Sequence, residues 1–471
     1  MRKGQVMECR WPACRVRPRS KRRITVVFQR GSVAGVFDPL FAGRVRRTGV
    51  QEAVAPKPGM VFLAGGHPDT AIFGEETLRE MASAVVGDGA AALQYGSTDG
   101  TGVMRETVAE VMTAEGTPVG AEHVAVTSGA QQGLDLAGRA FLEEGDLVLI
   151  ESPTYHGALQ AFSSYGPRVM TAPVDRRGLD VEAVREILSH ERRAGYRAKF
   201  IYVVPTFQNP TGATMALERR RELLEIAREH DALILEDNPY GLLRYEGDAV
   251  PTLAALEMRE RGGPERVVYL GSFSKVFAPG VRLGWIHAHP EILGAMRAAR
   301  KGADLGPSVL SQTVTAAYFA SGEWKTYLGR LGRHYRKRRD AVLGALGEFM
   351  PEGVSWTSPS GGFFVWVTLP QGIDAAGMLP EATERGVAYV PGADFYPGGW
   401  GGTEGRNALR LSFSFAEPRL ARRGVEILAG LVREKMGDNE TGPPACGCGS
   451  DACSCAPGYS CTEAVVGVVA C

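Results

Sequence analysis

The chain has 471 residues, enough for one large and one smaller domain. Hydrophobic residues make up 44% and charged residues 23%, and the formal net charge is zero. This balance argues against nucleic acid or a membrane surface as the main partner, and no apolar run in the sequence reaches the roughly 20 residues that cross a bilayer.

The two ends of the chain differ from its body. Residues 1–30 hold ten basic residues and one acidic residue, and all eight cysteines lie before residue 15 or after residue 445. A disulfide scaffold would spread its cysteines through the fold, so the body is expected to fold without them in a reducing cytoplasm. The head resembles a mitochondrial transit peptide but lacks its serine richness and amphipathic period, and a wrongly assigned upstream start in a bacterial gene is an equal alternative.

From about residue 123 to 286, short apolar runs alternate with helical patterns. Runs rich in Val, Ile and Leu predict strands buried on both faces of a mostly parallel sheet: HVAVTS, DLVLIES, RVMTA, KFIYVVP, ALILED and RVVYLGS. Between them, segments such as 216–231 are amphipathic with a period of 3.6. This alternation predicts an α/β doubly wound domain.

After about residue 320 the pattern changes. A long basic helical stretch over 324–349 precedes the strand-like runs GGFFVWVTL, VAYVP and ALRLSF, with helices near 374–385 and up to about 435. These elements predict a smaller α+β domain. Its basic helix is expected to present a solvated face, with nucleic-acid binding as a second alternative.

Polar residues follow several of the predicted strands, where ligands bind in open α/β sheets. Asp237 ends ALILED, Asn209 lies in an Asn-Pro-Thr-Gly turn, and Lys275 lies in GSFSKVFAPGVRLGW. TSGAQQGL reads as a strand, a small turn and a helix start that offers N–H groups to an anion. Each has a plainer explanation when taken alone, because Asp caps turns and Asn-Pro marks them.

Taken together, these residues match the requirements of pyridoxal phosphate chemistry. That chemistry needs a lysine, a carboxylate for the pyridine nitrogen, hydrogen bonds to the ring hydroxyl, a phosphate cradle and a cation for the substrate carboxylate. The chain resembles the fold-type I pyridoxal-phosphate enzymes, class I/II aminotransferases, and most closely the subgroup of 2-aminoadipate and kynurenine aminotransferases. The motifs cover roughly residues 55–436 in the family's order: LAGGHPD, LQYGSTDG, TSGAQQGL, SPTYHGA, NPTG, EDNPY, SFSKVFAPGVRLGW, PSGGFFVW, VPGADF and LRLSFS.

This resemblance implies a large domain with a mostly parallel seven-stranded sheet flanked by helices, plus a smaller α+β C-terminal domain. The expected divisions are a disordered basic head (1–30), a segment shared by the active site and small domain (31–80), the large domain (81–320), the small domain (321–436) and a flexible Cys-rich tail (437–471).

The resemblance also implies roles for the cofactor-binding residues. Lys275 would form the Schiff base with pyridoxal 5'-phosphate and move the substrate proton. Asp237 would pair with the pyridine nitrogen, and Tyr155 would stack on the ring. The remaining contacts would come from Asn209 and Tyr240 at the ring hydroxyl, and from Ser272, Arg282, Ala130 and Gln131 at the phosphate. Related enzymes commonly have serine where this chain has Ala130, so one phosphate contact is missing.

Further implied residues concern the substrate and the dimer. Arg410 would bind the substrate α-carboxylate bidentately, with Gly65, Gly66 and Asn209 beside the substrate. Tyr95 would reach the phosphate of the other subunit, so the resemblance implies a homodimer with shared active sites.

The implied reaction is transfer of the amino group of an L-amino acid to a 2-oxo acid, usually 2-oxoglutarate, by a ping-pong mechanism. The donor stays open among aminoadipate, aromatic, branched-chain and unusual biosynthetic amino acids. Alternatives are a lyase or decarboxylase on the same fold, or a winged-helix regulator with an aminotransferase-like domain. A regulator needs about 60 or more preceding residues for DNA binding, and only about 50 precede the match.

The C-terminal tail carries two Cys-x-Cys pairs. Cys446 and Cys448 form the first pair, and Cys453 and Cys455 form the second. These four thiols are candidates for zinc or copper(I) ligands. The alternatives are a dispensable disordered extension or an appendage whose cysteines are modified or cross-linked.

Overall fold

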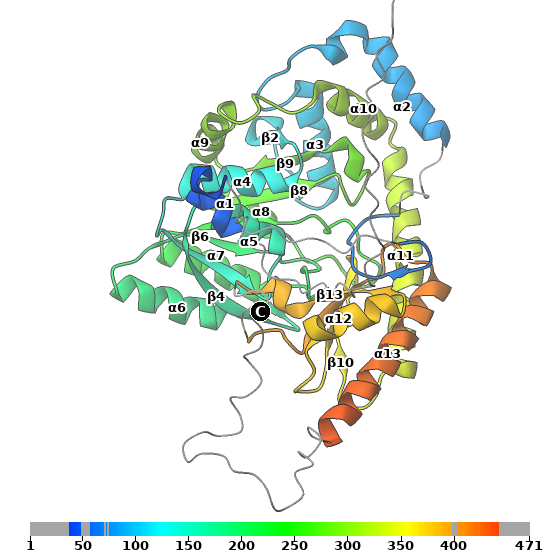
Figure 1. Ribbon diagram of the computed structural model, residues 1–471. Helices are drawn as coiled ribbons and strands as arrows, with labels where there is room; N and C mark the ends of the chain where they lie inside the picture. The colour runs from blue at the N-terminus through cyan, green and yellow to red at the C-terminus, as the bar shows by residue number, and fades with distance from the viewer. Residues whose placement is uncertain (1–36, 49–56, 70–71, 73–74, 398–402, 442–471) are drawn as a thin grey trace, which may run out of the picture.

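The computed structural model describes residues 37–48, 57–69, 72, 75–397 and 403–441 (Figure 1). The basic head and the Cys-rich tail lie outside these residues. The four candidate metal ligands, Cys446, Cys448, Cys453 and Cys455, belong to that tail, so a metal site there stays a prediction. Within the described ranges, no group of three or more His, Cys, Asp or Glu side chains is placed to hold a metal ion.

The large sheet has the strand order β2-β9-β8-β7-β6-β3-β4-β5. The inner strands β3, β4, β6, β7 and β8 pair in parallel, and β9 runs antiparallel between β2 and β8. The expected seven-stranded, mostly parallel sheet is confirmed, and the two-residue β5 extends it by a tight hairpin with β4. The bounds are β2 (Val124–Thr127), β3 (Leu147–Ser152), β4 (Arg168–Asp175), β5 (Gly178–Leu179), β6 (Ala198–Val203), β7 (Leu233–Asp237), β8 (Val267–Ser272) and β9 (Gly284–His287).

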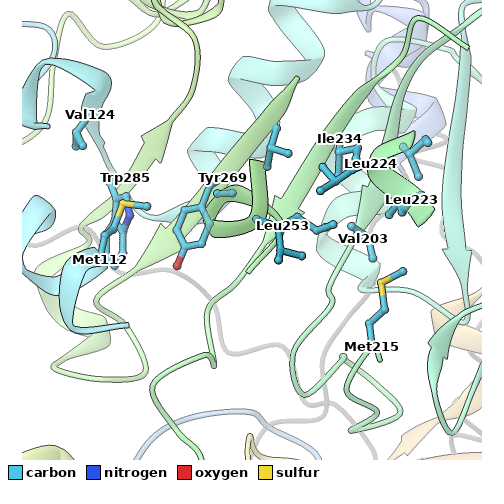
Figure 2. Close-up of a cluster of buried hydrophobic side chains, with 14 of the residues drawn as sticks. Met112, Val124, Val203, Met215, Leu223, Leu224, Ile234, Leu253, Tyr269 and Trp285 are labelled. Carbon is cyan, nitrogen blue, oxygen red and sulfur yellow. The ribbon is translucent and has the colours of Figure 1, made fainter. Parts of the chain in front are cut away.

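Helices cover both faces of this sheet, because alternate side chains of each strand point to opposite faces. On β6, Phe200 and Tyr202 pack in one apolar cluster and Ile201 and Val203 in another. Figure 2 shows part of the second cluster, with Leu223 and Leu253 from helices beside Ile234 and Val203 from strands. The first cluster includes side chains from α4 (Ala130–Phe141), α5 (His156–Ser163) and α9 (Pro290–Lys301), and the second from α3 (Gly102–Ala114), α6 (Val181–Arg193), α7 (Leu217–Glu229), α8 (Leu253–Arg261) and α10 (Val309–Ala320).

The C-terminal part contains an antiparallel sheet in the order β10-β11-β14-β13. The helices α12 and α13 of this C-terminal part lie together with the strand β10 at the lower right of Figure 1. The bounds are β10 (Ser355–Trp356), β11 (Phe364–Thr368), β13 (Val390–Pro391), β14 (Ala408–Ser412), α11 (Glu323–Phe349), α12 (Ala375–Glu384) and α13 (Pro418–Thr441).

Two details differ from the sequence expectation. The VAYVP run divides at Tyr389 because its two halves pair with different strands: β12 (Val387–Ala388) pairs in parallel with β1 (Val61–Phe62), and β13 pairs antiparallel with β14. Helix α13 also continues past residue 435.

The remaining described elements are η1 (Asp38–Leu40), α1 (Gly43–Thr48), α2 (Glu75–Asp88), η3 (Gly89–Leu93), η4 (Ala121–His123), η5 (Pro279–Val281) and η6 (Gly392–Phe395).

The basic helix α11 does not simply present a solvated face. Arg338 and Arg339 are buried. Arg338 donates to the carbonyls of Ser414 and Ala416 and pairs with Asp69, so it ties the N-terminal segment to the chain after β14. Among the described helices, none is long and apolar enough to cross a membrane.

Candidate active site

Four segments that are distant in sequence meet at the carboxyl ends of the parallel strands. Lys275 Nζ, just after β8, donates a 2.8 Å hydrogen bond to the Gly66 carbonyl. Arg410, on β14 of the small sheet, donates to the Ala64 carbonyl at 2.7 Å and to Asn209 Oδ1 at 2.8 Å. The structure thus brings Lys275, Asn209, Arg410 and the 64–66 segment together, as the sequence predicts.

Lys275 lies in a half-buried position beside an aromatic ring. Its Nζ is 5.8 Å from the centre of the Phe363 ring. Burial lowers the pKa of Lys275 to about 8, and the positive charges of Arg410 and Arg282 contribute. A lower pKa makes the neutral, nucleophilic amine available near physiological pH.

Asp237, the last residue of β7, is 3% exposed. Tyr202 donates a 2.8 Å hydrogen bond to Oδ2, and Oδ1 is buried without a partner among the described residues. Burial raises the pKa of Asp237 to about 6, although the Tyr202 bond opposes this shift. A buried carboxylate with one unpaired oxygen fits a cationic N–H donor.

The start of α4 forms a cradle for an anion. Gly129 has a φ of +93°, and a Cβ there would lie 2.9 Å from Arg282 Nη2. A Cβ on Gly284 would lie 2.7 Å from the Ala130 nitrogen. These two glycines let the exposed Arg282 and β9 approach the first N–H groups of the helix, where anions bind.

Ser272 lies at the end of β8 near this cradle. Its Oγ accepts a 3.1 Å hydrogen bond from the Ser274 N–H, which leaves the hydroxyl hydrogen for another acceptor. Gln131 was expected to hold the anion. Its side-chain amide donates to the Gly157 carbonyl at 2.7 Å and accepts from the Tyr155 hydroxyl at 3.2 Å, so this side chain orients Tyr155, while the backbone N–H of Gln131 lies in the first turn of α4.

The two tyrosines expected at the ring are both neutral phenols. Burial raises the pKa of Tyr155 to about 12 and moves that of Tyr240 well above its usual value. Tyr240 is buried and packs edge-to-face on Phe363 and Phe364, with ring centres 5.6 and 5.9 Å apart.

Sequence reasoning missed the aromatic surroundings of Arg410. The guanidinium carbon lies 4.0 Å from the centre of the Phe364 ring and 4.9 Å from that of Phe395. A Cβ on Gly66 would lie 2.6 Å from Phe364 Cζ, so Gly66 packs against the same aromatic side chain as Arg410. It also missed Tyr202, whose signal was a hydroxyl among the buried apolar residues Phe200, Ile201 and Val203 of β6.

Tyr95 is not enclosed in the site of its own chain. Its side chain is 89% exposed, in the loop between η3 and α3.

The model of the family "Aminotransferase class I and II" matches residues 61–425. The chain belongs to the class I and II aminotransferases. It is 42% identical over 379 residues to aromatic-amino-acid aminotransferase 1 of Thermococcus litoralis, covering 80% of this chain and 89% of that one. It is 39% identical over 395 residues to 2-aminoadipate transaminase of Thermus thermophilus, covering 83% and 95%.

A solved structure shares the fold of this aminotransferase. Kynurenine aminotransferase from Pyrococcus horikoshii, crystallised with PMP, superposes with a TM-score of 0.79 at 39% identity, covering 86% of this chain and 100% of that one. The enzyme is therefore a pyridoxal-phosphate-dependent aminotransferase, and these relatives favour the enzyme over the regulator. The site fits the cofactor, because the unpaired Oδ1 of Asp237 matches a protonated pyridine nitrogen.

Proposed function

We propose that this aminotransferase moves the amino group of an L-amino acid to 2-oxoglutarate in two half-reactions at one site. The observation that carries the proposal is the placement of Lys275 and Arg410 on the carbonyls of Gly66 and Ala64. One amine and one guanidinium therefore flank the same short backbone segment. Their spacing suits a small molecule with a reacting Cα and a carboxylate.

Pyridoxal phosphate, when bound, supplies the electron sink that stabilises negative charge at the substrate Cα. Lys275 Nζ takes the Cα proton and returns it, and its lowered pKa favours this role. Asp237 keeps the ring nitrogen protonated. Arg410 binds the α-carboxylate with its planar guanidinium, which a lysine cannot imitate.

The remaining side chains position the cofactor. Arg282, Ser272 and the N–H groups of Ala130 and Gln131 would hold the phosphate. Tyr155 would cover the ring face, with Asn209 and Tyr240 at the ring hydroxyl. Because Arg410 donates to Asn209 Oδ1, the Asn209 amide nitrogen is turned toward a different acceptor.

The proposal extends to assembly, domains and location. Exposed apolar side chains occur on both sides of Tyr95 in the sequence, Leu93 and Val103, and at the start of α10, Leu310. They favour a homodimer in which Tyr95 serves the partner's site. One apolar cluster consists almost entirely of residues of 81–320, and another holds many buried residues of 321–436 together with a few such as Tyr240 and Val276. This distribution favours a large domain over 81–320 and a small one over 321–436, joined by 31–80. The cysteine-free body suits the cytoplasm, and the proposed context of the reaction is amino-acid biosynthesis.

A visible spectrum of the purified protein tests the reaction. The relatives define the first donors to add: aromatic amino acids and 2-aminoadipate. A yellow band that bleaches with a donor and returns with 2-oxoglutarate establishes transamination and names the donor. Lys275→Ala should lack the band, whereas Lys199→Ala, at a distant and more exposed site, should keep it.

Two results would count against the proposal. A band that no amino acid bleaches would favour a lyase, a decarboxylase or a sensor. No band in the presence of added pyridoxal phosphate would contradict the proposed site itself.

A further inference from the structure

Gln208 and Glu151 form a buried hydrogen-bonded pair that none of the roles above uses. Both side chains are 1% exposed. Gln208 Nε2 donates to Glu151 Oε2 at 3.1 Å and to the Pro153 carbonyl at 2.8 Å. Glu151 Oε2 also accepts the Val204 N–H at 3.1 Å, at the end of β6. The pair therefore joins the ends of the neighbouring strands β3 and β6.

The amide of Gln208 has one orientation that satisfies its surroundings. Its Oε1 accepts from the Thr211 N–H at 2.8 Å and from the Thr211 hydroxyl at 2.7 Å. A backbone N–H can only donate and a carbonyl can only accept, so the oxygen faces Thr211 and the nitrogen faces Pro153. The amide oxygen stabilises the turn that contains Gln208 itself, and the amide nitrogen binds the Pro153 carbonyl in the turn after β3.

These two turns carry residues assigned to the cofactor. Asn209 follows Gln208 directly, and Tyr155 follows Pro153 in the turn that leads to α5. Asn209 in turn receives the 2.8 Å bond from Arg410. A displacement of Gln208 would therefore reach the ring-hydroxyl contact and the carboxylate-binding arginine together.

Glu151 is suited to hold Gln208 without adding a charge. Burial and the nearby Asp237 raise the pKa of Glu151 to about 8, which favours the protonated carboxyl at neutral pH. The negative charge at this end of the strands then stays on Asp237. Glutamine, the neutral isostere of glutamate, can present the same accepting oxygen to Val204 and Gln208 in place of Glu151.

We propose that Gln208, held by Glu151, is a positioning residue that fixes the Asn209 amide against the ring hydroxyl of the cofactor. The proposal rests on the function proposed above. The hydrogen bond from the Asn209 amide favours the ionised form of the ring oxygen. Loss of the Gln208 amide bridge should move Asn209 and weaken this hydrogen bond. The pH midpoint of the visible band should then change, independently of turnover.

The experiment compares pH titrations of the visible spectrum in the holoenzyme. Asn209→Ala serves as the reference for complete loss of the contact. Gln208→Ala and Gln208→Glu should each shift the midpoint in the same direction, by about 0.5–1 pH unit, where one unit is a tenfold change in the equilibrium. The double variant Gln208→Ala/Asn209→Ala should shift no further than Asn209→Ala, because both changes remove one interaction.

The conservative variant supplies a rescue. Glu151→Gln should keep the wild-type midpoint, whereas Glu151→Ala should shift it. Gln208→Glu places an oxygen against the Pro153 carbonyl and Glu151 Oε2, so it should bind the cofactor less tightly than Gln208→Ala.

Thr117→Val controls for a general loss of stability. It removes a buried hydroxyl pair with Thr252, 2.8 Å apart and away from the site, and should leave the midpoint unchanged. If Gln208→Ala does not fold, Glu151→Ala carries the test, because it retains the Gln208 bonds to Thr211 and Pro153.

Midpoints of the Gln208 variants equal to those of wild type and Thr117→Val, while Asn209→Ala shifts, would overturn the positioning role. A wild-type protein without a band in the presence of pyridoxal phosphate would overturn the proposed function instead.

Discussion

Tyr202 donates a 2.8 Å hydrogen bond to one carboxylate oxygen of Asp237, and the other oxygen is buried without a partner in the described part of the chain. Both side chains are almost completely buried. An ionised carboxylate there loses more solvation than one hydroxyl replaces. The fold therefore holds Asp237 ready for a cation.

Asp237→Asn should change how the stability of the cofactor-free protein depends on pH. The carboxyl ionises near 3.8 when unfolded and at about 6 in the fold. Between these values the folded protein binds more protons, so its stability falls as the pH rises through this window. The loss above pH 6 is about 3 kcal/mol. Urea unfolding from about pH 4.5 to 7.5 should show a gain for Asp237→Asn over wild type that grows with pH. A difference that stays constant would mean that the carboxylate is already paired.

Arg410→Lys should reduce kcat/KM for the amino-acid donor. The substitution removes the planar pair of donors and the stacking on Phe364, which lies 4.0 Å away, but it keeps the charge. A loss of about 2–3 kcal/mol corresponds to roughly 30–150-fold. Steady-state kinetics should show the loss while the spectrum of the bound cofactor persists. Arg333→Lys on the exposed side of α11 is the matched control, and equal losses in the two variants would contradict the role of Arg410.

Gly66→Ala should raise KM at least about tenfold, which is about 1.4 kcal/mol. The new Cβ would lie 2.6 Å from Phe364 Cζ, so the ring must move and Arg410, which stacks on it, moves with it. The Gly66 carbonyl would also leave Lys275. Gly430→Ala in α13 is the control, because nothing lies within 4 Å of its added Cβ. An unchanged KM in Gly66→Ala would show that Gly66 and Phe364 do not contact the substrate.

Ala130→Ser should strengthen cofactor binding. Ala130 begins α4, where the helix N–H groups face the predicted phosphate, and a serine hydroxyl would add one hydrogen bond to the anion. We expect about 1 kcal/mol, a fivefold lower dissociation constant for pyridoxal phosphate, from spectral titration. Ala137→Ser, further along the same helix, should not increase the affinity.

Mixed dimers test the shared site. Tyr95→Ala and Lys275→Ala homodimers should each be impaired. Their hybrid contains one site with wild-type Tyr95 and Lys275, because these residues come from different subunits in the proposed dimer. Random re-association should restore about a quarter of wild-type activity. No recovery would place Tyr95 in the site of its own chain or outside both sites.

The sequence by itself determined the sheet and most of the chemical groups. Continuous apolar runs specify strands buried on both faces, and alternation with amphipathic segments specifies parallel connection. Asp237 and Lys275 could be assigned because a polar residue at the end of such a strand lies at the sheet edge, and the order of motifs then matched one family.

Only the tertiary structure decided how those groups are held. The pairing of Tyr202 with Asp237, of Gln208 with Glu151 and of Arg410 with Asn209 joins residues from different strands and both sheets. The side-chain amide of Gln131 orients Tyr155, because the Gly157 carbonyl and the Tyr155 hydroxyl both lie within its reach. Arg338 lies on a helix for which the sequence predicts a solvated face. It is buried because distant parts of the chain, the carbonyls after β14 and Asp69, supply its hydrogen-bond partners. The periodicity of a sequence records which residues leave water, but hydrogen-bond partners depend on distances that only the folded chain sets.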